Sequence, residues 1–267
     1  MDSATASQVV FWRALVQLAV LSPVVLVRYR GRIAQPFRDM GWNGVLGAMA
    51  LAVSYLSGIN SLNLTSVGNA MFVISTAPLM TGLLAHVVLK ERLKGTTWFA
   101  MALATGGVGV MAVAAMDAGQ LTGTLVAAVS ALTYAIFTVS LRRQRTADML
   151  PLLVLGGVFA AVLALLVSNG VRIPKHDLLI TLYLGSIPMA LGLFLYTSGA
   201  RTLNAAELPL IAMVEVVLAP FWVWLFLGET LSPGTILGGV IVLGAVVIQA
   251  VAGFRRERVP LGLSAGS

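Results

Sequence analysis

The sequence predicts an all-α membrane protein of about nine transmembrane helices. Its composition, its apolar runs and the placement of its charges all indicate this fold class. The chain has 267 residues, of which 58% are hydrophobic and only 10% charged. Soluble domains carry about 25% charged residues, so a water-soluble fold of this size lacks the charges to cover its surface. A surface that faces lipid needs none.

Nine runs of mostly apolar residues are long enough to cross a bilayer, which takes about 20 residues as a helix. The links between them are short, so we expect no extramembrane domain. Tryptophans near the ends of several runs fit the aromatic belt at a membrane interface. The runs are 8–27, 42–60, 67–89, 96–115, 121–141, 150–168, 178–199, 204–227 and 233–252.

The basic residues predict the orientation of the chain. Of the 17 lysine and arginine residues, 14 lie in alternate links or in the C-terminal tail. The links on the other side contain only Arg172 and Lys175, and Arg13 lies near the start of the first run. Because positive charge is retained on the cytoplasmic side, we expect a protein of the cell membrane with a cytoplasmic C-terminus and Met1 outside.

Two stretches of the chain are alike. Residues 89–113 (LKERLKGTTWFAMALATGGVGVMAV) align with residues 227–251 (LGETLSPGTILGGVIVLGAVVIQAV) at an offset of 138, which pairs Glu91 with Glu229. The offset covers five helices, so the second copy crosses the membrane in the opposite direction. Such inverted-topology repeats are typical of secondary transporters, because two similar halves of opposite orientation can exchange conformations.

The repeat divides the chain into units of unequal size. The first, 8–115, holds four helices, and the second, 121–252, holds five; a cytoplasmic tail at 253–267 follows. We expect that the first helix of the first unit is missing, through a truncation or a misassigned start. A genuine nine-helix protein with an external N-terminus is the alternative.

Three segments resemble the ten-helix EamA-type members of the drug/metabolite transporter superfamily. They are VVFWRALVQLAVLSP, which contains Arg13, APLMTGLLAHVVLKERL (77–93) and VEVVLAPFWVWLFLGETL (214–231). Pro78 and Glu91 keep the family's spacing of a proline before a helix-ending glutamate, while Val216 replaces the proline in the second copy. The resemblance implies transport of small metabolites without ATP hydrolysis, through a cavity formed by helices 42–60, 67–89, 178–199 and 204–227.

Two charged residues inside the runs are candidates for binding. Glu215 lies near the middle of its run, where an ionised side chain is costly and usually faces a cavity. It is a candidate for binding a proton or a substrate amine, and a structural hydrogen bond or a partner arginine is the alternative. Arg13 lies one turn inside the first run. It either reaches back to the interface or points inward and binds a substrate carboxylate.

Further polar and aromatic residues within the runs are candidates for lining the cavity, although helix packing alone explains each one singly. A wall of tyrosine and tryptophan suits amino acids or aromatic compounds. These candidates are Tyr55, Asn69, Thr76, Tyr134, Tyr196 and Trp222.

Other residues are predicted to shape the helices. Pro78 and Pro188 interrupt backbone hydrogen bonding within a helix and are hinge or kink candidates, whereas Glu91 and Glu229 are expected to be structural helix-end residues. Small residues are expected where helices approach closely. These are Ala102, Gly106, Gly109 and the pair Gly234 and Gly238.

We therefore predict secondary-active export of a small metabolite, such as an amino acid or a related compound, by alternating access. The expected partners are this substrate, the lipid bilayer and protons as coupling ion. A non-transporting or truncated membrane protein and a membrane-embedded enzyme are the alternatives. The sequence lacks HExxH, GxSxG and Walker A patterns, and it has no cysteine and only two histidines. We expect no enzyme activity, cofactor, metal or nucleic-acid partner.

Overall fold

The computed structural model describes residues 4–30, 34–90, 95–117, 119–143, 150–168, 170–183, 225–226 and 232–257. The secondary structure within these ranges is helical, with no strand. Residues 175–183 are also helical. The named helices are α1 (Ala6–Arg28), α2 (Ala34–Asp39), α3 (Gly41–Leu64), α4 (Val67–Ile74), α5 (Ala77–Leu89), α6 (Gly95–Asp117), α7 (Leu121–Arg143), α8 (Leu150–Val167) and α11 (Pro233–Glu257).

Six segments of the described residues are apolar and long enough to cross a bilayer, and they coincide closely with the first six predicted runs. The prediction of an all-α membrane protein is therefore confirmed. The run 233–252 corresponds to α11, whose apolar part is Pro233–Ile248. Most of the runs 178–199 and 204–227 lies outside the described residues.

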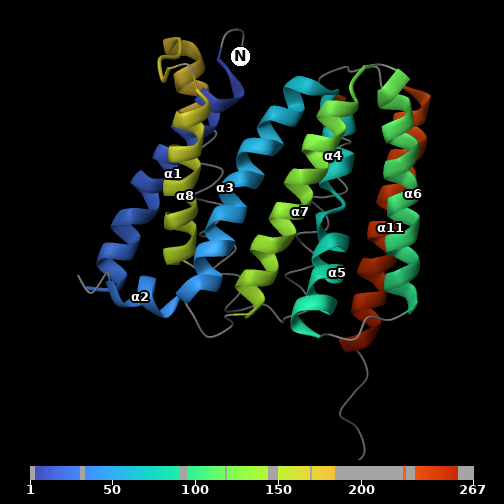
Figure 1. The fold of residues 1–267 in the computed structure, drawn as a ribbon, viewed down its shortest axis with the longest axis horizontal. Helices are drawn as coiled ribbons and strands as arrows, with labels where there is room; N and C mark the ends of the chain where they lie inside the picture. The colour runs from blue at the N-terminus through green and yellow to red at the C-terminus, as the bar shows by residue number, and fades with distance from the viewer. Residues whose placement is uncertain are drawn as a thin grey trace, which may run out of the picture.

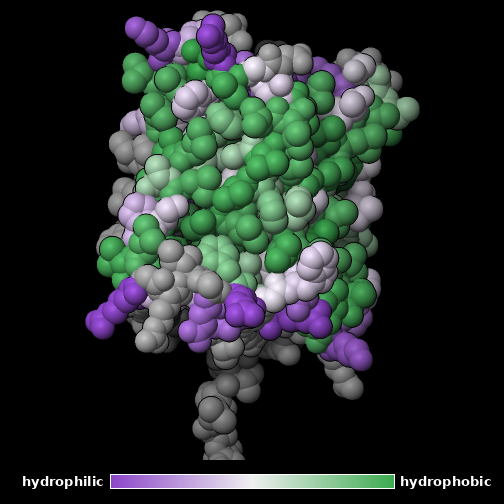
Figure 2. Space-filling view, turned by 60° about the vertical axis from the view of Figure 1, so that its left-hand side comes forward, coloured by the Kyte–Doolittle hydropathy of each residue, from purple (hydrophilic) through white to green (hydrophobic). Residues whose placement is uncertain are grey.

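The helices stand side by side in a bundle (Figure 1). α1, α8 and α3 form one side and α6 and α11 the other, while α7 stands between them with α4 and α5. We call the end at which α1, α5 and α7 finish the basic end, because it holds Arg28, Lys90 and Arg143. Figure 2 shows a broad apolar belt between polar residues at the two ends. This belt is the surface that lipid covers.

Local sequence sets where two of the helices begin. Thr5 caps α1: its hydroxyl accepts a hydrogen bond from the backbone N–H of Gln8, and the Gln8 side chain accepts one from the backbone N–H of Thr5. Ser66 caps α4 by accepting from the backbone N–H of Asn69 at 3.1 Å. Both caps satisfy N–H groups that the first turn of a helix leaves without a partner.

The predicted run 67–89 is broken into α4 and α5 just before Pro78, which lies in the first turn of α5. Proline has no N–H to donate, and its ring clashes with the carbonyl four residues earlier. Ser75 and Thr76 occupy the break, and each hydroxyl donates to the carbonyl three residues earlier, at 2.6 and 2.7 Å. The hydroxyls thus supply hydrogen bonds where the regular helix stops.

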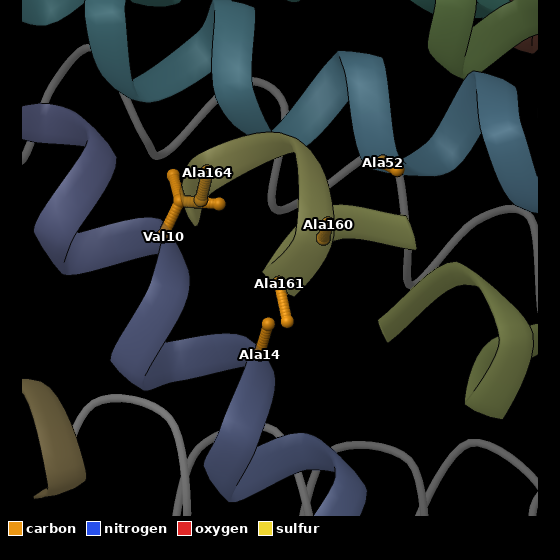
Figure 3. Close-up of a cluster of buried hydrophobic side chains, with 6 residues drawn as sticks. All are labelled: Val10, Ala14, Ala52, Ala160, Ala161 and Ala164. Carbon is orange, nitrogen blue, oxygen red and sulfur yellow. The ribbon is translucent and has the colours of Figure 1, made fainter. Parts of the chain in front are cut away.

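Small side chains allow α1 and α8 to lie close together (Figure 3). In lipid, helices associate mainly through packing contacts. Lipid tails are as apolar as the helix surfaces, so the hydrophobic effect does not drive the helices together. Short side chains bring the backbones near enough for many such contacts. The buried cluster between these helices, with one residue from α3, consists of Val10, Ala14, Ala52, Ala160, Ala161 and Ala164.

Glycines allow a similar close contact between α6 and α11. A Cβ atom built on Gly107 would lie 2.8 Å from the carbonyl oxygen of Gly238, and one built on Gly234 would lie 2.6 Å from the Cβ of Ala114. Any larger residue at these positions would push the helices apart. The prediction of close packing at Gly234 and Gly238 is therefore confirmed.

The prediction of which small residues of α6 pack against another helix was wrong. Ala102, Gly106 and Gly109 are exposed, and a Cβ atom on either glycine would meet nothing within 4 Å. The contact face instead holds Ala104 and Gly107, which are buried. Small residues occur all around α6, so helical spacing alone did not identify the side that faces α11.

Two packed pairs consist of helices that the sequence repeat relates. α6 begins at Gly95 and α11 at Pro233, positions that differ by the offset of 138 residues, and the two helices run antiparallel (Figure 1). The same offset places the counterpart of α1 at residues 144–166, which overlaps α8. α1 and α8 also run antiparallel.

The contact between α6 and α11 predicts opposite outcomes for two neighbouring glycines. Gly107→Ala places a methyl group against the backbone of α11, and overpacking of this kind typically costs about 1–3 kcal/mol of unfolding free energy. Thermal unfolding of the purified protein in detergent should therefore show a lower Tm.

Gly106→Ala is the matched control. Its added methyl group meets open space, and alanine favours a helix more than glycine by about 1 kcal/mol. We expect an unchanged or slightly raised Tm. Equal destabilisation by both substitutions would contradict the packing described for Gly107.

Candidate functional site

Arg13 points into the bundle from α1. Its guanidinium carbon lies 5.3 Å from the centroid of the Tyr55 ring, which belongs to α3. Arg13 is seven residues into α1, about 10 Å along the helix from its start. A cation over an aromatic face is attracted by the negative charge of the ring face. Of the two positions considered for this side chain, the structure has the inward one.

Tyr134 of α7 lies near the same tyrosine, since Tyr55 interacts electrostatically with both Arg13 and Tyr134. Leu132 and Ile136 of α7 are exposed apolar side chains. Tyr134 is two residues from each, about 200° around the helix, so it projects on the opposite side. Its side chain is nevertheless 45% exposed. Its ring is thus exposed on the side of α7 away from Leu132 and Ile136.

A pair of serines sets the register of the helices that carry the two tyrosines. The Ser54 hydroxyl donates to the backbone carbonyl of Ser130 at 3.1 Å, and the Ser130 hydroxyl donates to the carbonyl of Ser54 at 3.0 Å. Ser54 precedes Tyr55, and Ser130 lies one turn before Tyr134. The two hydrogen bonds therefore fix the register of α3 against α7 within about one helical turn of each tyrosine.

Two polar atoms of α1 are buried without a hydrogen-bond partner among the described residues. They are Nε of Arg13 and Oε1 of Gln17, one helical turn apart. The other end of the Gln17 amide donates to the carbonyl of Leu153 in α8 at 3.0 Å. Sequence reasoning did not single out Gln17, although a polar residue four positions after Arg13 in an apolar helix was a signal for it.

Asn69 and Thr76 lie away from this site. The Asn69 side chain donates to the hydroxyls of Thr65 and Thr124 at 2.9 and 2.8 Å, which ties the start of α4 to α7. Thr76 donates to a carbonyl at the break between α4 and α5. Both side chains are buried and their hydrogen bonds are with neighbouring helix ends.

A set of hydrogen bonds at the end opposite the basic end was not predicted from the sequence. Trp12 donates from its indole N–H to the carbonyl of Val171 at 2.8 Å, and Gln8 donates to the carbonyls of Gly170 and Arg172, both at 3.1 Å. These contacts join α1 to the segment after α8. Trp12 is one of the tryptophans near the end of a run that the sequence assigned to the membrane interface, and this contact was missed because contacts between distant segments leave no local pattern.

The remaining candidates lie outside the described residues, namely Glu215, Tyr196, Trp222, Pro188, Glu91 and Glu229. Pro78 lies at the break before α5. Within the ranges that the structure describes, no three His, Asp or Glu side chains come together as metal ligands. The candidates that the structure brings near one another are therefore Arg13, Tyr55 and Tyr134.

These features define a multi-pass membrane protein in which a cation and aromatic rings face the interior of a helical bundle. Residues 1–113 and 121–250 match the EamA-like transporter family. The chain belongs to this family, as its sequence motifs predicted.

Two relatives carry names that describe transport. A biotin transporter of Escherichia coli (strain K12) is 26% identical over 75% of this chain and 69% of its own length. A probable terminal-alkyne amino-acid exporter of Streptantibioticus cattleyicolor is 29% identical over 71% of this chain and 67% of its own. The family and these relatives indicate transport as the general function.

A solved structure has the same fold. A protein of known crystal structure superposes with a TM-score of 0.61 over 96% of this chain and 91% of its own, at 17% sequence identity. At this identity the likeness concerns the fold alone.

The interior position of Tyr134 predicts its reactivity after replacement by cysteine. The chain has no native cysteine, so a single introduced thiol can be followed. In Tyr134→Cys, we expect a small charged methanethiosulfonate reagent to label the thiol, because we expect this side of α7 to face a water-accessible cavity. Labelling is measured by mass spectrometry of protein in liposomes.

Leu132→Cys is the control, because Leu132 is 43% exposed, almost as much as Tyr134, but projects from the opposite side of α7, which we expect to face lipid. A charged reagent is excluded from lipid because of the cost of a charge in hydrocarbon. Leu132→Cys should therefore be labelled at least about tenfold more slowly than Tyr134→Cys. Equal rates for the two variants would refute the interior assignment of Tyr134.

Proposed function

We propose that this chain is a secondary-active transporter that exports a small metabolite, such as an amino acid or a related compound, across the cell membrane. The proposal rests on the contact of Arg13 with the Tyr55 ring, and on the nearby Tyr134, inside an apolar bundle. A charge within the membrane usually marks a substrate or ion pathway. Aromatic rings beside it suit a small organic molecule.

We further propose that transport proceeds by alternating access between two inverted units, 8–115 and 121–252. The antiparallel pairs α1–α8 and α6–α11 support this proposal, because each joins helices that the sequence repeat relates. In an inverted repeat, exchanging the conformations of the two units converts an inward-open state into an outward-open one. No enzymatic step is part of this cycle.

Glu215 remains our candidate for the proton or substrate-amine site. A carboxyl group placed in the middle of a membrane span is usually functional, and its protonation state can change as the site opens to one side or the other. Proton binding there would couple export to the proton gradient.

The direct test of export is a comparison of the growth medium of cells with and without the expressed chain. We expect one or a few small metabolites to accumulate outside the expressing cells, as measured by mass spectrometry, and to exchange across proteoliposomes that contain the purified protein. Equal media and no exchange for amino acids and related compounds would overturn the proposal.

Glu215→Gln should abolish export of the metabolite identified in this way, because glutamine resembles glutamate in shape but cannot take up a proton. The amount of protein in the membrane should stay unchanged, as measured by fluorescence of a C-terminal fusion. Glu207→Gln, eight residues earlier in the same predicted span, is the control and should keep export. Export at the original rate in Glu215→Gln would contradict the role assigned to Glu215.

The proposed orientation places the basic end in the cytoplasm. His176 and Gln35 are exposed at opposite ends of the bundle. Replacing either residue by cysteine leaves every lysine and arginine in place. In intact cells, a membrane-impermeant maleimide should label His176→Cys but not Gln35→Cys, which should react only after the cells are opened. The reverse pattern would show that the orientation is inverted.

A further inference from the structure

Arg13 is a cation inside the membrane without a carboxylate partner among the described side chains. Two acidic side chains are described: Asp39 belongs to α2 at the basic end, and Asp177 accepts a hydrogen bond from the backbone N–H of Ala4 at 3.2 Å. Neither pairs with Arg13. An unpaired charge inside the membrane is costly, so the position favours any anion that can reach it.

Tyr55 holds the guanidinium group without using its N–H donors. The contact is made through the ring face at 5.3 Å, whereas the five N–H donors of an arginine lie in the plane of the guanidinium group. Nε is buried and has no hydrogen-bond acceptor in the described part of the chain. The arginine is thus positioned by its aromatic neighbour and still has hydrogen-bonding capacity for a ligand.

The charge of the site fits a singly charged anion. The other described basic residues lie at the ends of the bundle, such as Arg28 and Lys90 at the basic end and Arg172 and Lys175 at the opposite end. A phosphate dianion generally needs more than one cation or a set of backbone N–H donors. A carboxylate needs one arginine, because its two coplanar oxygens match the fork of N–H groups.

We propose that Arg13, positioned on the Tyr55 ring, binds the carboxylate of the transported molecule, so that the substrates are small carboxylic acids, amino acids among them. The half-exposed ring of Tyr134 provides an apolar surface for the rest of the substrate. Amino acids and biotin, which appear in the names of two relatives, are both carboxylic acids. This inference rests on the proposed transport function and specifies the chemical group that is recognised.

The test compares acids with their amides, which match them in shape but lack the negative charge. The probes are L-phenylalanine, L-leucine, 4-phenylbutyrate and biotin, each with its primary amide. Binding is measured as the concentration-dependent rise in Tm of the purified protein, and transport as exchange in proteoliposomes. We expect at least one acid to bind at least about tenfold more tightly than its amide, the preference expected of a charge-assisted hydrogen bond.

Variants connect this preference to the two residues. Arg13→Gln should reduce the preference for the acid by about tenfold or more, whereas Tyr55→Phe should retain it because the ring face remains. Tyr55→Leu removes the ring and should weaken acid binding while leaving amide binding unchanged. Arg172→Gln removes an arginine outside the site and is the matched control, with no expected change in preference.

The outcomes separate this inference from the proposed function. Transport of acids and amides at equal rates, or an unchanged acid preference in Arg13→Gln, overturns the carboxylate assignment and leaves transport standing. Arg13-dependent acid binding without any exchange supports the assignment and contradicts transport. Failure of every acid to bind above its amide also overturns the assignment. If Arg13→Gln does not fold, the contrast between Tyr55→Phe and Tyr55→Leu decides the question.

Discussion

The reciprocal hydrogen bonds between Ser54 and Ser130 fix the relation of α3 to α7, and the interior of the bundle depends on that relation. In hydrocarbon no water competes for the two hydroxyls, so each bonds to the facing backbone. The bonds leave only one register for the two helices. Tyr55 and Tyr134, each within about one turn of this pair, are thereby positioned, and Arg13 is placed on the Tyr55 ring. A serine pair without chemistry of its own thus positions the groups that we assign to the substrate.

Small residues determine how the remaining helices meet. α1 and α8 pack through alanines, and α6 and α11 pack through Gly107, Gly234 and Gly238. Packing of this kind depends on dispersion contacts over short distances. Such contacts are lost or regained by small relative movements of whole helices. Helix pairs held in this way suit a protein that we propose changes between two conformations.

Arg13 shows how a charge can be kept inside such a bundle. The Tyr55 ring attracts the cation, but it supplies no hydrogen-bond acceptor for the N–H groups. The guanidinium is thus stabilised in part and remains capable of binding an anion. No carboxylate in the part of the chain that the structure describes pairs with Arg13; such an ion pair would have left fewer N–H groups for a ligand.

Periodicity, composition and charge alone determined that the chain is helical, that it lies in a membrane and where its described spans run, while three sequence motifs indicated its family. These properties depend on the apolar character of residues close together in the sequence. Tertiary structure alone decided which face of each helix is inside. Gly107 rather than Gly106 meets α11, Asn69 and Thr76 lie apart from the site, and Arg13 points to Tyr55 instead of the interface. In helices that are apolar or small on every side, the sequence contains no contrast that marks the interior, so only contacts between distant segments can select it.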